Sequence, residues 1–339
     1  MVLTALITLA VAQTAAKPAA VPAFSVKRLR ELQGIRPLAF APSPTGSQIA
    51  VTLEDKSVRI IDAKTFQTIR SFQGHPQPAY AIAWSDDGSF IASGDESARI
   101  FIWDARTGKQ IKLIYGEHQR GIQKLSFNHP RSLLMSTGKD DKILVWSIPG
   151  YKKVGQLLGN GANLYGGTFH PLTNMFASAT LTATARTYQT GPAGVKPMNF
   201  FGSDPQGQLD VCWNKAGSQI MTGEKSGNAV IFDMKTLKKF GTLKGHMDFV
   251  TNVAFAPSGR LAATASPDRT VRLWDPKSLK QLAQLDEQSG VGSPVVFTAD
   301  GKYMATVGIN DFMQIYALTP AQTTTPAVPV KAPAVKKKG

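Results

Sequence analysis

The four residues Arg272-Leu273-Trp274-Asp275 end a segment that recurs through most of this 339-residue chain. Six related runs of apolar residues end in an aliphatic or aromatic residue that aligns with Trp274. The intervals between successive aligned residues are 42, 43, 42, 44, 42 and 42 residues. Regular spacing on this scale is typical of repeat proteins, so we expect seven repeats to fill residues 24–318. The other aligned residues are Ile61, Trp103, Trp146, Tyr188, Phe232 and Tyr316.

Each repeat subdivides into four short segments of strand-like pattern. In the second repeat these are Ala79–Trp84, Ser89–Ser93, Arg99–Trp103 and Lys109–Tyr115, and Gly, Asp and Ser residues separate them. No segment keeps a helical period. Four strands in about 42 residues correspond to one blade of a propeller. The sequence therefore predicts an all-β fold, a seven-bladed β-propeller with four antiparallel strands in each blade.

In its repeats the chain resembles the WD-repeat β-propeller family, over about 295 of its residues. The family hallmark is a Gly-His pair followed at set spacings by Ser or Thr, by Asp and by Trp-Asp. The sixth repeat has every element, and the third matches nearly so, with Ser147 in place of the final Asp. The second repeat matches in part, and the first, fourth, fifth and seventh are degenerate. The hallmark residues are His118, Ser136, Asp140 and Trp146 in the third repeat, and His246, Thr264, Asp268 and Trp274 in the sixth.

The resemblance implies a structural role for these residues. An indole N–H, a hydroxyl, an imidazole and a carboxylate can form one chain of hydrogen bonds in which each buried polar group has a partner. We expect this relay in the third and sixth blades. The second repeat has His75, Ser93 and Trp103, but Ser97 stands where the carboxylate is expected.

The resemblance also implies how the ring closes. Residues 26–34 align with the fourth strand segment of later repeats, for example residues 66–74, and they precede the first full repeat. In the family the first segment supplies the outer strand of the last blade. We therefore expect the N-terminal strand to join the seventh blade.

The two ends of the chain differ in composition from the repeats. Residues 1–23 contain an apolar run and an Ala-x-Ala site, which resembles a signal peptide; a disordered Ala-rich arm is the alternative. We expect a secreted or periplasmic protein, with a cytoplasmic one as the alternative. Residues 319–339 are rich in Pro, Ala and Lys and predict a disordered tail. No stretch is long and apolar enough to predict a membrane-spanning helix.

The formal net charge is +15, and Lys17 with the four lysines of the tail accounts for five of these charges. Many of the remaining basic residues fall on predicted outer strands, where lysine discourages edge-to-edge aggregation. They are dispersed, and no aromatic platform accompanies them, so nucleic acid is an unlikely partner. These basic residues are Lys27, Arg28, Arg30, Lys109, Lys112, Lys152, Lys153, Lys238, Lys239, Lys244 and Lys280.

No motif predicts catalysis, a metal site or a cofactor. The three histidines of Gly-His type have structural roles by resemblance, and Cys212 is the single cysteine. We therefore expect no enzyme activity, no metal, no cofactor and a monomer that binds a protein or peptide partner on the propeller rim. The alternative is an exported envelope protein that binds an anionic polymer or surface through its basic tail and perimeter. Rim residues at the family's contact positions are Tyr80, Arg120, Lys139, Tyr165, Lys225, Asp248 and Phe249.

Overall fold

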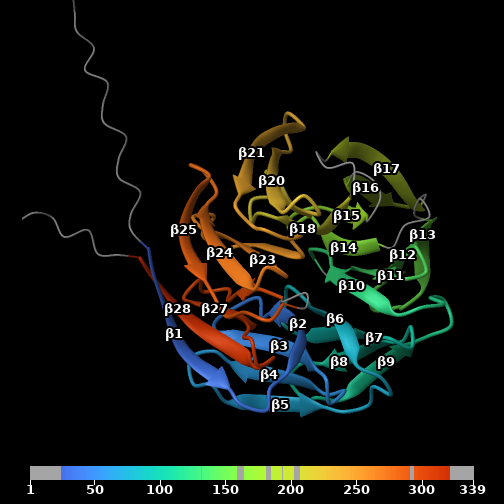
Figure 1. Cartoon of the computed structure of the whole chain (residues 1–339). Coiled ribbons are helices and arrows are strands. Elements are labelled where there is room, and N and C mark those ends of the chain that lie inside the picture. The colour runs from blue at the N-terminus through green and yellow to red at the C-terminus, as the bar shows by residue number, and fades with distance from the viewer. Residues whose placement is uncertain are drawn as a thin grey trace, which may run out of the picture.

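The computed structural model describes residues 24–130, 132–158, 164–180, 185–192, 194–201, 207–290 and 294–320. In these ranges the chain forms strands and turns and contains no helix. Seven four-stranded antiparallel sheets surround a central axis (Figure 1). This arrangement confirms the predicted seven-bladed β-propeller. The segment predicted to be a signal peptide, residues 1–23, and residues 321–339 lie outside the described residues.

Six blades are each built from four consecutive strands, with the first strand nearest the axis and the fourth at the perimeter (Figure 1). Blades 1 to 3 are β2 (Pro37–Pro42), β3 (Gln48–Leu53), β4 (Val58–Asp62) and β5 (Thr68–Phe72); β6 (Ala79–Trp84), β7 (Phe90–Asp95), β8 (Ile100–Asp104) and β9 (Gln110–Ile114); and β10 (Ile122–Phe127), β11 (Leu133–Gly138), β12 (Lys142–Ser147) and β13 (Lys153–Leu158). Blades 4 to 6 are β14 (Leu164–Phe169), β15 (Met175–Thr180), β16 (Ala185–Gly191) and β17 (Gly194–Phe201); β18 (Gln208–Trp213), β19 (Gln219–Glu224), β20 (Asn228–Asp233) and β21 (Lys238–Lys244); and β22 (Asn252–Phe255), β23 (Ala262–Ser266), β24 (Thr270–Asp275) and β25 (Lys280–Leu285).

The seventh blade closes the ring with strands from both ends of the described chain. It contains β26 (Val296–Phe297), β27 (Tyr303–Val307) and β28 (Met313–Pro320), and β1 (Phe24–Leu32) pairs with β28 at the perimeter. The Gln314 amide donates to the Glu31 carboxylate across this seam, over 2.8 Å. The structure therefore confirms the predicted closure. β28 continues past the expected boundary at residue 318 and pairs Pro320 with Phe24.

The apolar core is divided among the contacts between neighbouring blades. Each cluster of buried side chains draws on two adjacent blades: Val58 of blade 1 packs with Trp103 of blade 2, for example. The last contact, between blades 7 and 1, contains Ile315 and Ile49. Because burial drives folding roughly in proportion to the apolar area removed from water, a blade is stabilised mainly by its neighbours. Closure by β1 therefore matters for the whole ring.

Candidate functional site

The relay of blade 6 links four side chains, from the loop before β22, from β23, from the turn that follows it and from β24. The Trp274 indole donates to the Thr264 hydroxyl over 2.9 Å, and that hydroxyl lies 2.7 Å from His246 Nε2. His246 Nδ1 lies 2.8 Å from the Asp268 carboxylate. With a neutral imidazole protonated on Nδ1, each donor in this chain faces an acceptor.

Blade 3 repeats the arrangement with serine in place of threonine. The Trp146 indole donates to Ser136 Oγ over 2.9 Å, and Ser136 Oγ lies 2.8 Å from His118 Nε2. His118 Nδ1 lies 2.9 Å from the Asp140 carboxylate. Both relays therefore join the loop before the first strand of a blade to the second and third strands of that blade.

Burial sets the protonation states in these two relays. Loss of water around the imidazoles lowers the pKa of His118 and of His246, although the adjacent carboxylates act in the opposite direction. Burial by itself would raise the pKa of Asp140 and of Asp268. Hydrogen bonds to the two carboxylates outweigh that effect and lower both values. The relays thus pair a neutral histidine with a charged aspartate.

Each of these carboxylates also fixes a loop on one face of the ring. Asp140 accepts the Gln119 N–H over 2.9 Å, and Asp268 accepts the Met247 N–H over 3.0 Å. Residues 119 and 247 directly precede the predicted contact residues Arg120 and Asp248. The relay therefore connects the interior of a blade to the loop that carries candidate contact residues.

Blade 2 completes the relay with a residue that sequence reasoning missed. His75 Nδ1 lies 3.0 Å from the Asp95 carboxylate, and His75 Nε2 lies 2.6 Å from Ser93 Oγ. The Trp103 indole donates to Ser93 over 2.8 Å. The carboxylate comes from the end of β7, two positions before Ser97, where the family pattern places it. The missing hairpin aspartate therefore does not break the relay of blade 2.

A proline explains this exchange. Pro76 aligns with Gln119 of blade 3, and proline has no N–H for a carboxylate to accept. The position that aligns with Asp95 is Gly138 in blade 3. A Cβ at Gly138 would lie 2.5 Å from both His118 Nδ1 and Asp140 Oδ1, so the two carboxylate positions exclude each other. The combination of Pro76 with Asp95 was the signal available in the sequence.

The predicted contact residues of blades 2 and 3 are Tyr80, Arg120 and Lys139, and the structure adds Glu96 to them. We call these four residues the blade 2–3 cluster. The Lys139 ammonium lies 2.7 and 2.8 Å from the two Glu96 oxygens and 5.6 Å from the centre of the Tyr80 ring. Arg120 is exposed, and the Tyr80 side chain is 43% exposed. The ion pair thus places a cation against an accessible aromatic ring.

A second group, which we call the blade 5–6 cluster, contains Lys225, Met247, Asp248 and Phe249. The Val250 N–H donates to the Glu224 carbonyl over 2.9 Å and holds the loop against the hairpin that carries Lys225. Met247 is 91% exposed and Phe249 44% exposed. This cluster therefore presents two apolar side chains beside charged ones.

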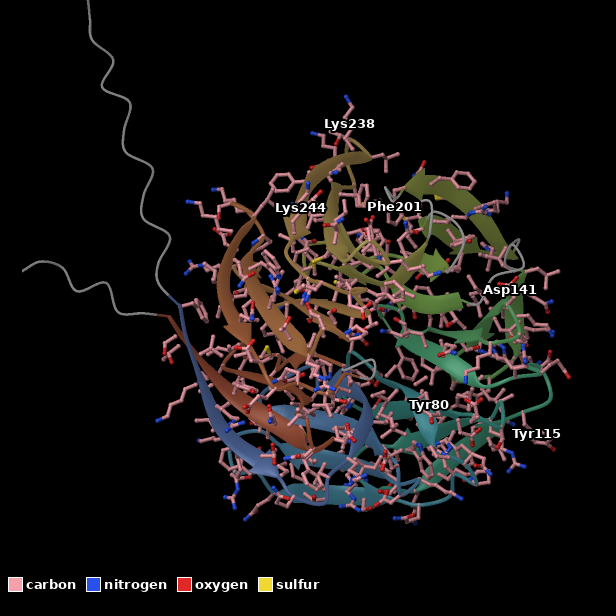
Figure 2. All side chains as sticks on the ribbon, viewed as in Figure 1. Tyr80, Tyr115, Asp141, Phe201, Lys238 and Lys244 are labelled. Atoms are coloured by element: carbon pink, nitrogen blue, oxygen red, sulfur yellow. The ribbon has the colours of Figure 1, made fainter. Side chains whose placement is uncertain are left out.

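The six predicted rim residues whose side chains the structure describes fall into two groups. Blades 2 and 3 lie on a different side of the axis from blades 5 and 6 (Figure 1). Tyr80 lies on the inner part of the ring, whereas Tyr115 and Lys238 lie at its perimeter (Figure 2). Tyr165 lies on β14, but its side chain is outside the described part of the structure. The structure thus shows two clusters where the sequence suggested one set.

The described residues offer little for catalysis or metal binding. Burial raises the pKa of the Cys212 thiol far above its ordinary value, and the Asp210 charge adds to this effect. A protonated thiol is a poor nucleophile. Within the described ranges, no three His, Cys, Asp or Glu side chains gather into a group that could hold a metal ion. No helix in those ranges is long and apolar enough to cross a bilayer.

Comparison with known proteins adds sequence evidence. The family model "WD domain, G-beta repeat" matches residues 66–104, 108–147 and 237–275. These ranges contain all the relay residues of blades 2, 3 and 6. The three repeats in which the structure shows a complete relay are thus the three that the family model matches.

Three relatives show how far the likeness extends. The WD repeat-containing protein srw1 of Schizosaccharomyces pombe is 26% identical over 68% of this chain and 41% of its own length. The B-type cell cycle switch protein ccs52A of Medicago truncatula is 27% identical over 68% of this chain and 48% of its own. THO complex subunit 3 of Arabidopsis thaliana is 24% identical over 73% and 78%. The chain therefore spans about half of the first two relatives.

The matched repeats, the complete relays and the closed ring of seven four-stranded blades agree with one another. The protein belongs to the WD-repeat β-propeller family, and the coarse role that goes with the family is that of a protein-interaction scaffold.

Proposed function

We propose that this protein is a non-enzymatic scaffold that binds a protein or peptide partner through the blade 2–3 and blade 5–6 clusters. The observation that carries the proposal is the link from the relays of blades 3 and 6 to a loop of each cluster. Asp268 bonds the backbone of Met247, and Asp140 bonds that of Gln119. A loop that is already fixed loses little conformational freedom when a partner binds, so less binding free energy is spent on ordering.

The composition of the two clusters supports the same role. Binding hot spots are enriched in aromatic residues and arginine, and interfaces as a whole are also enriched in methionine. The clusters offer Tyr80, Arg120, Met247 and Phe249 on the surface. Two clusters on different sides of the axis suit a partner that crosses the face of the ring, or two partners. We propose a monomeric scaffold without a cofactor.

Site-specific photocrosslinking in intact cells tests this proposal. A photoreactive residue replaces Met247, which is 91% exposed in the blade 5–6 cluster, or Tyr115, which is 71% exposed at the perimeter. We expect one dominant crosslinked protein from position 247, lost when Phe249→Ala is added, and no such product from position 115. Equal crosslinking at both positions, or a product insensitive to Phe249→Ala, would contradict the proposal.

A second candidate function is binding of an anionic polymer or surface at the perimeter. The observation in its favour is that exposed lysines lie on outer strands. Lys238 and Lys244 (Figure 2) and Lys239 are on β21, and Lys112 is on β9. Screening separates the two functions, because exposed charges interact weakly beyond about 8 Å at physiological salt. A bound species that dissociates at a few hundred millimolar salt would favour the anionic polymer.

Export remains part of that second candidate. We propose secretion or a periplasmic location on the basis of residues 1–23, with a cytoplasmic location as the alternative. The relatives named above come from a yeast and two plants. N-terminal sequencing of the protein from cell fractions tests it. A mature chain that begins at Gln13 supports export, and an intact Met1 supports the cytoplasm.

A further inference from the structure

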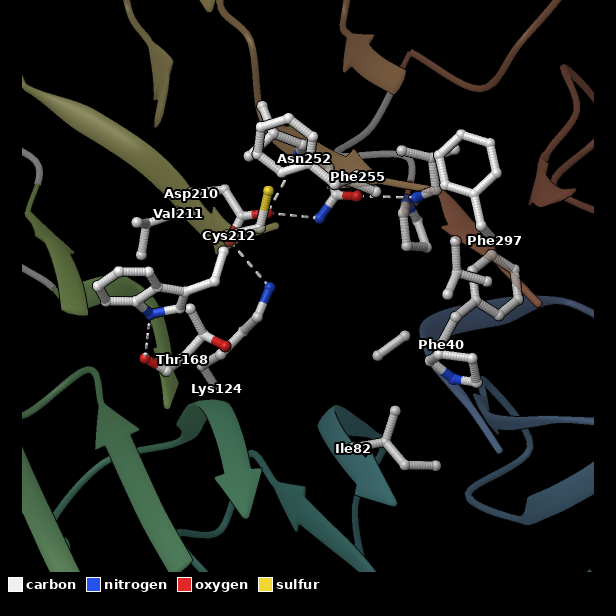
Figure 3. A pocket seen from close by; sticks show the side chains of 18 of the residues that line it. Phe40, Ile82, Lys124, Thr168, Asp210, Val211, Cys212, Asn252, Phe255 and Phe297 are labelled. Carbon is white, nitrogen blue, oxygen red and sulfur yellow. Dashed lines mark hydrogen bonds and ion pairs between the residues drawn. The ribbon is translucent and has the colours of Figure 1, made fainter. Parts of the chain in front are cut away.

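A cavity of about 720 Å³ lies at the axis of the ring, lined by residues of the innermost strands (Figure 3). Its size is within the range of sites for small organic ligands, roughly 300–1,000 Å³. Such sites combine a mainly apolar lining with a few polar groups that fix the orientation of the ligand. The polar groups of this cavity therefore decide what it could bind.

Three of the polar residues, Lys124, Asp210 and Asn252, occupy equivalent positions on the innermost strands of blades 3, 5 and 6. Lys124 pairs with Thr137, and Asp210 and Asn252 hold the same place in the registers of blades 5 and 6. The equivalent residue of blade 4 is Gly166, where a Cβ would lie 2.9 Å from Asp210 Cα. Because glycine stands there, Lys124 of blade 3 reaches past blade 4 to Asp210 of blade 5 (Figure 3).

Asp210 has a partner on each of its oxygens. Its Oδ1 accepts from the Lys124 ammonium over 2.9 Å. Its Oδ2 accepts from the Asn252 amide over 2.9 Å and from the Val253 N–H over 3.2 Å. The side-chain oxygen of Asn252 (Oδ1) accepts the Val295 N–H over 2.9 Å. The carboxylate and amide of this layer are thus engaged, and Asp210 is 3% exposed.

Lys124 differs from its neighbours in this layer. An ammonium has three N–H donors, and the contact with Asp210 uses one of them. Its side chain is 32% exposed, whereas that of Asp210 is 4% exposed. A second lysine, Lys215, also lines the cavity. Lys124 thus faces the cavity, and the exposed Lys215 belongs to the turn after β18. The one carboxylate of the lining already has partners on both oxygens, which favours an anion as ligand.

The opposite wall is apolar. Phe40, Ile82 and Phe297 face Lys124 and Asp210 from the other side of the cavity (Figure 3). Phe297 is 3% exposed and Ile82 is 7% exposed, so both belong to the packed core as well as to the lining. A ligand that filled this cavity would thus have an apolar body and a single negative charge at one end.

We propose that the central cavity is a binding site for a small organic carboxylate with an aromatic or aliphatic body, and that Lys124 binds its charge. The carboxylate accepts from the N–H donors of Lys124 that point away from Asp210. The apolar body packs against Phe40, Ile82 and Phe297. This activity is separate from the protein-binding role proposed for the two surface clusters.

Isothermal titration calorimetry with a matched pair of probes tests the proposal. We use 1-naphthaleneacetate and its neutral isostere 1-naphthaleneacetamide with the full-length protein. A charge-assisted hydrogen bond is roughly twice as strong as a neutral one, so we expect the carboxylate to bind about tenfold more tightly. Equal affinities, tighter binding of 1-naphthylmethylammonium, or no binding of the carboxylate at millimolar concentration would overturn the proposal.

Variants of the ion pair give effects of opposite sign. Lys124→Met keeps the apolar stem and should reduce carboxylate affinity to that of the amide. Asp210→Asn removes the competing charge and should increase carboxylate affinity severalfold. Lys112→Met on β9 is the control at the perimeter and should change nothing. An Asp210→Asn variant that binds the carboxylate more weakly than the natural protein would overturn the assignment to Lys124.

Folding is the remaining concern, because Lys124→Met leaves a buried carboxylate without its cation. The double variant Lys124→Met/Asp210→Asn keeps the cavity without either charge, and circular dichroism checks its fold. Its affinity for the carboxylate should equal its affinity for the amide. A double variant that still prefers the carboxylate would overturn the proposal.

Discussion

Blades 6 and 4 share one strand plan and fill the same buried positions with different chemistry. In blade 6, Trp274 and Thr264 belong to a relay that ends on Asp268. In blade 4 the equivalent positions hold Tyr188 and Ser178. The Tyr188 ring stacks on Phe176 with 4.9 Å between ring centres, and the Ser178 hydroxyl has no hydrogen bond within the described part of the chain.

This difference shows what the relay contributes. Blade 4 forms its four-stranded sheet with Tyr188 in place of the relay tryptophan, so that tryptophan is not required for four strands to pair. What blade 6 gains is the bond from Asp268 to the Met247 N–H, which fixes a loop of the blade 5–6 cluster. The relay therefore serves the surface as well as the interior.

Blade 7 fills the relay positions with a third set of side chains. The Tyr316 hydroxyl donates to the Gln314 amide oxygen over 2.7 Å, and Gln314 in turn donates to Glu31 of the closing strand. Gln288 occupies the position of the relay histidine and lies 3.3 Å from both partners. Here the buried polar network holds the ring seam instead of a surface loop.

The largest effect should come from loss of that seam. Deletion of residues 24–34 removes β1, leaves blade 7 with three strands and exposes apolar residues of its core. We expect loss of cooperative thermal unfolding by circular dichroism, because both kinds of blade depend on packed neighbours. Addition of a peptide with the sequence of residues 24–34 should restore part of the transition. An unchanged melting temperature after the deletion would refute the closure mechanism.

The next largest effect compares the two kinds of blade directly. Asp268→Ala leaves the His246 N–H and the Met247 N–H without their acceptor, so we expect a loss of about 2 kcal/mol in the free energy of unfolding. Ser178→Ala removes a hydroxyl that has no described partner and should change stability by less than about 0.5 kcal/mol. Urea denaturation measures both. Equal losses in the two variants would mean that the relay gives blade 6 no special stability.

A smaller effect should follow when the relay carboxylate of blade 2 is moved from position 95 to position 97. Asp95→Gly removes the acceptor of His75, and adding Ser97→Asp recreates the arrangement of Gly138 and Asp140 in blade 3. We expect the second change to recover about 1 kcal/mol of unfolding free energy lost in the first. In the natural background Ser97→Asp should not stabilise, because Asp95 already occupies the site. If Ser97→Asp fails to rescue Asp95→Gly, the two positions are not interchangeable.

The smallest effect is a dependence on pH. The pKa of both His118 and His246 is lowered in the fold, so the unfolded chain binds protons that the folded chain does not. Stability should therefore fall modestly as the pH decreases below about 6.5, where the histidines of the unfolded chain become protonated. The lowered pKa of Asp140 and Asp268 acts in the same direction below about pH 3.8.

Chemical denaturation between pH 5 and 8 measures this slope. The double variant His118→Gln/His246→Gln should show a shallower slope than the natural protein. Part of the slope should remain, because the pKa of His170 is also lowered by burial. A slope that is unchanged in the double variant would show that the relay histidines do not account for it.

The fold could be predicted from the sequence because the pattern of apolar residues repeats at a regular spacing. The spacing of Trp274 and its aligned residues predicted seven blades, and the alternation in Ala79–Trp84 predicted a strand with those bounds. Other strand ends differ by one or two residues, as for Ser89–Ser93, observed as Phe90–Asp95. Turn residues mark a strand end less sharply than hydrogen bonds do.

The candidate sites were harder to predict. Tyr80 and Lys139 were named separately, but Lys139 of blade 3 is held against Tyr80 by its ion pair with Glu96 of blade 2. Lys124 and Asp210 are 86 residues apart and carry no motif. Neither pair has a local pattern, because each is brought together by the ring and not by one repeat.

The sequence by itself determined the number of blades, the order of their strands and the identity of most relay residues. These features arise within one repeat, where spacing along the chain fixes which side chains meet. Only the tertiary structure decided that Asp95 replaces the expected carboxylate, that the rim residues divide into two clusters, and that Lys124 crosses blade 4 to Asp210. Such contacts join different strands or blades, and their distances are set by packing around the axis rather than by separation in sequence.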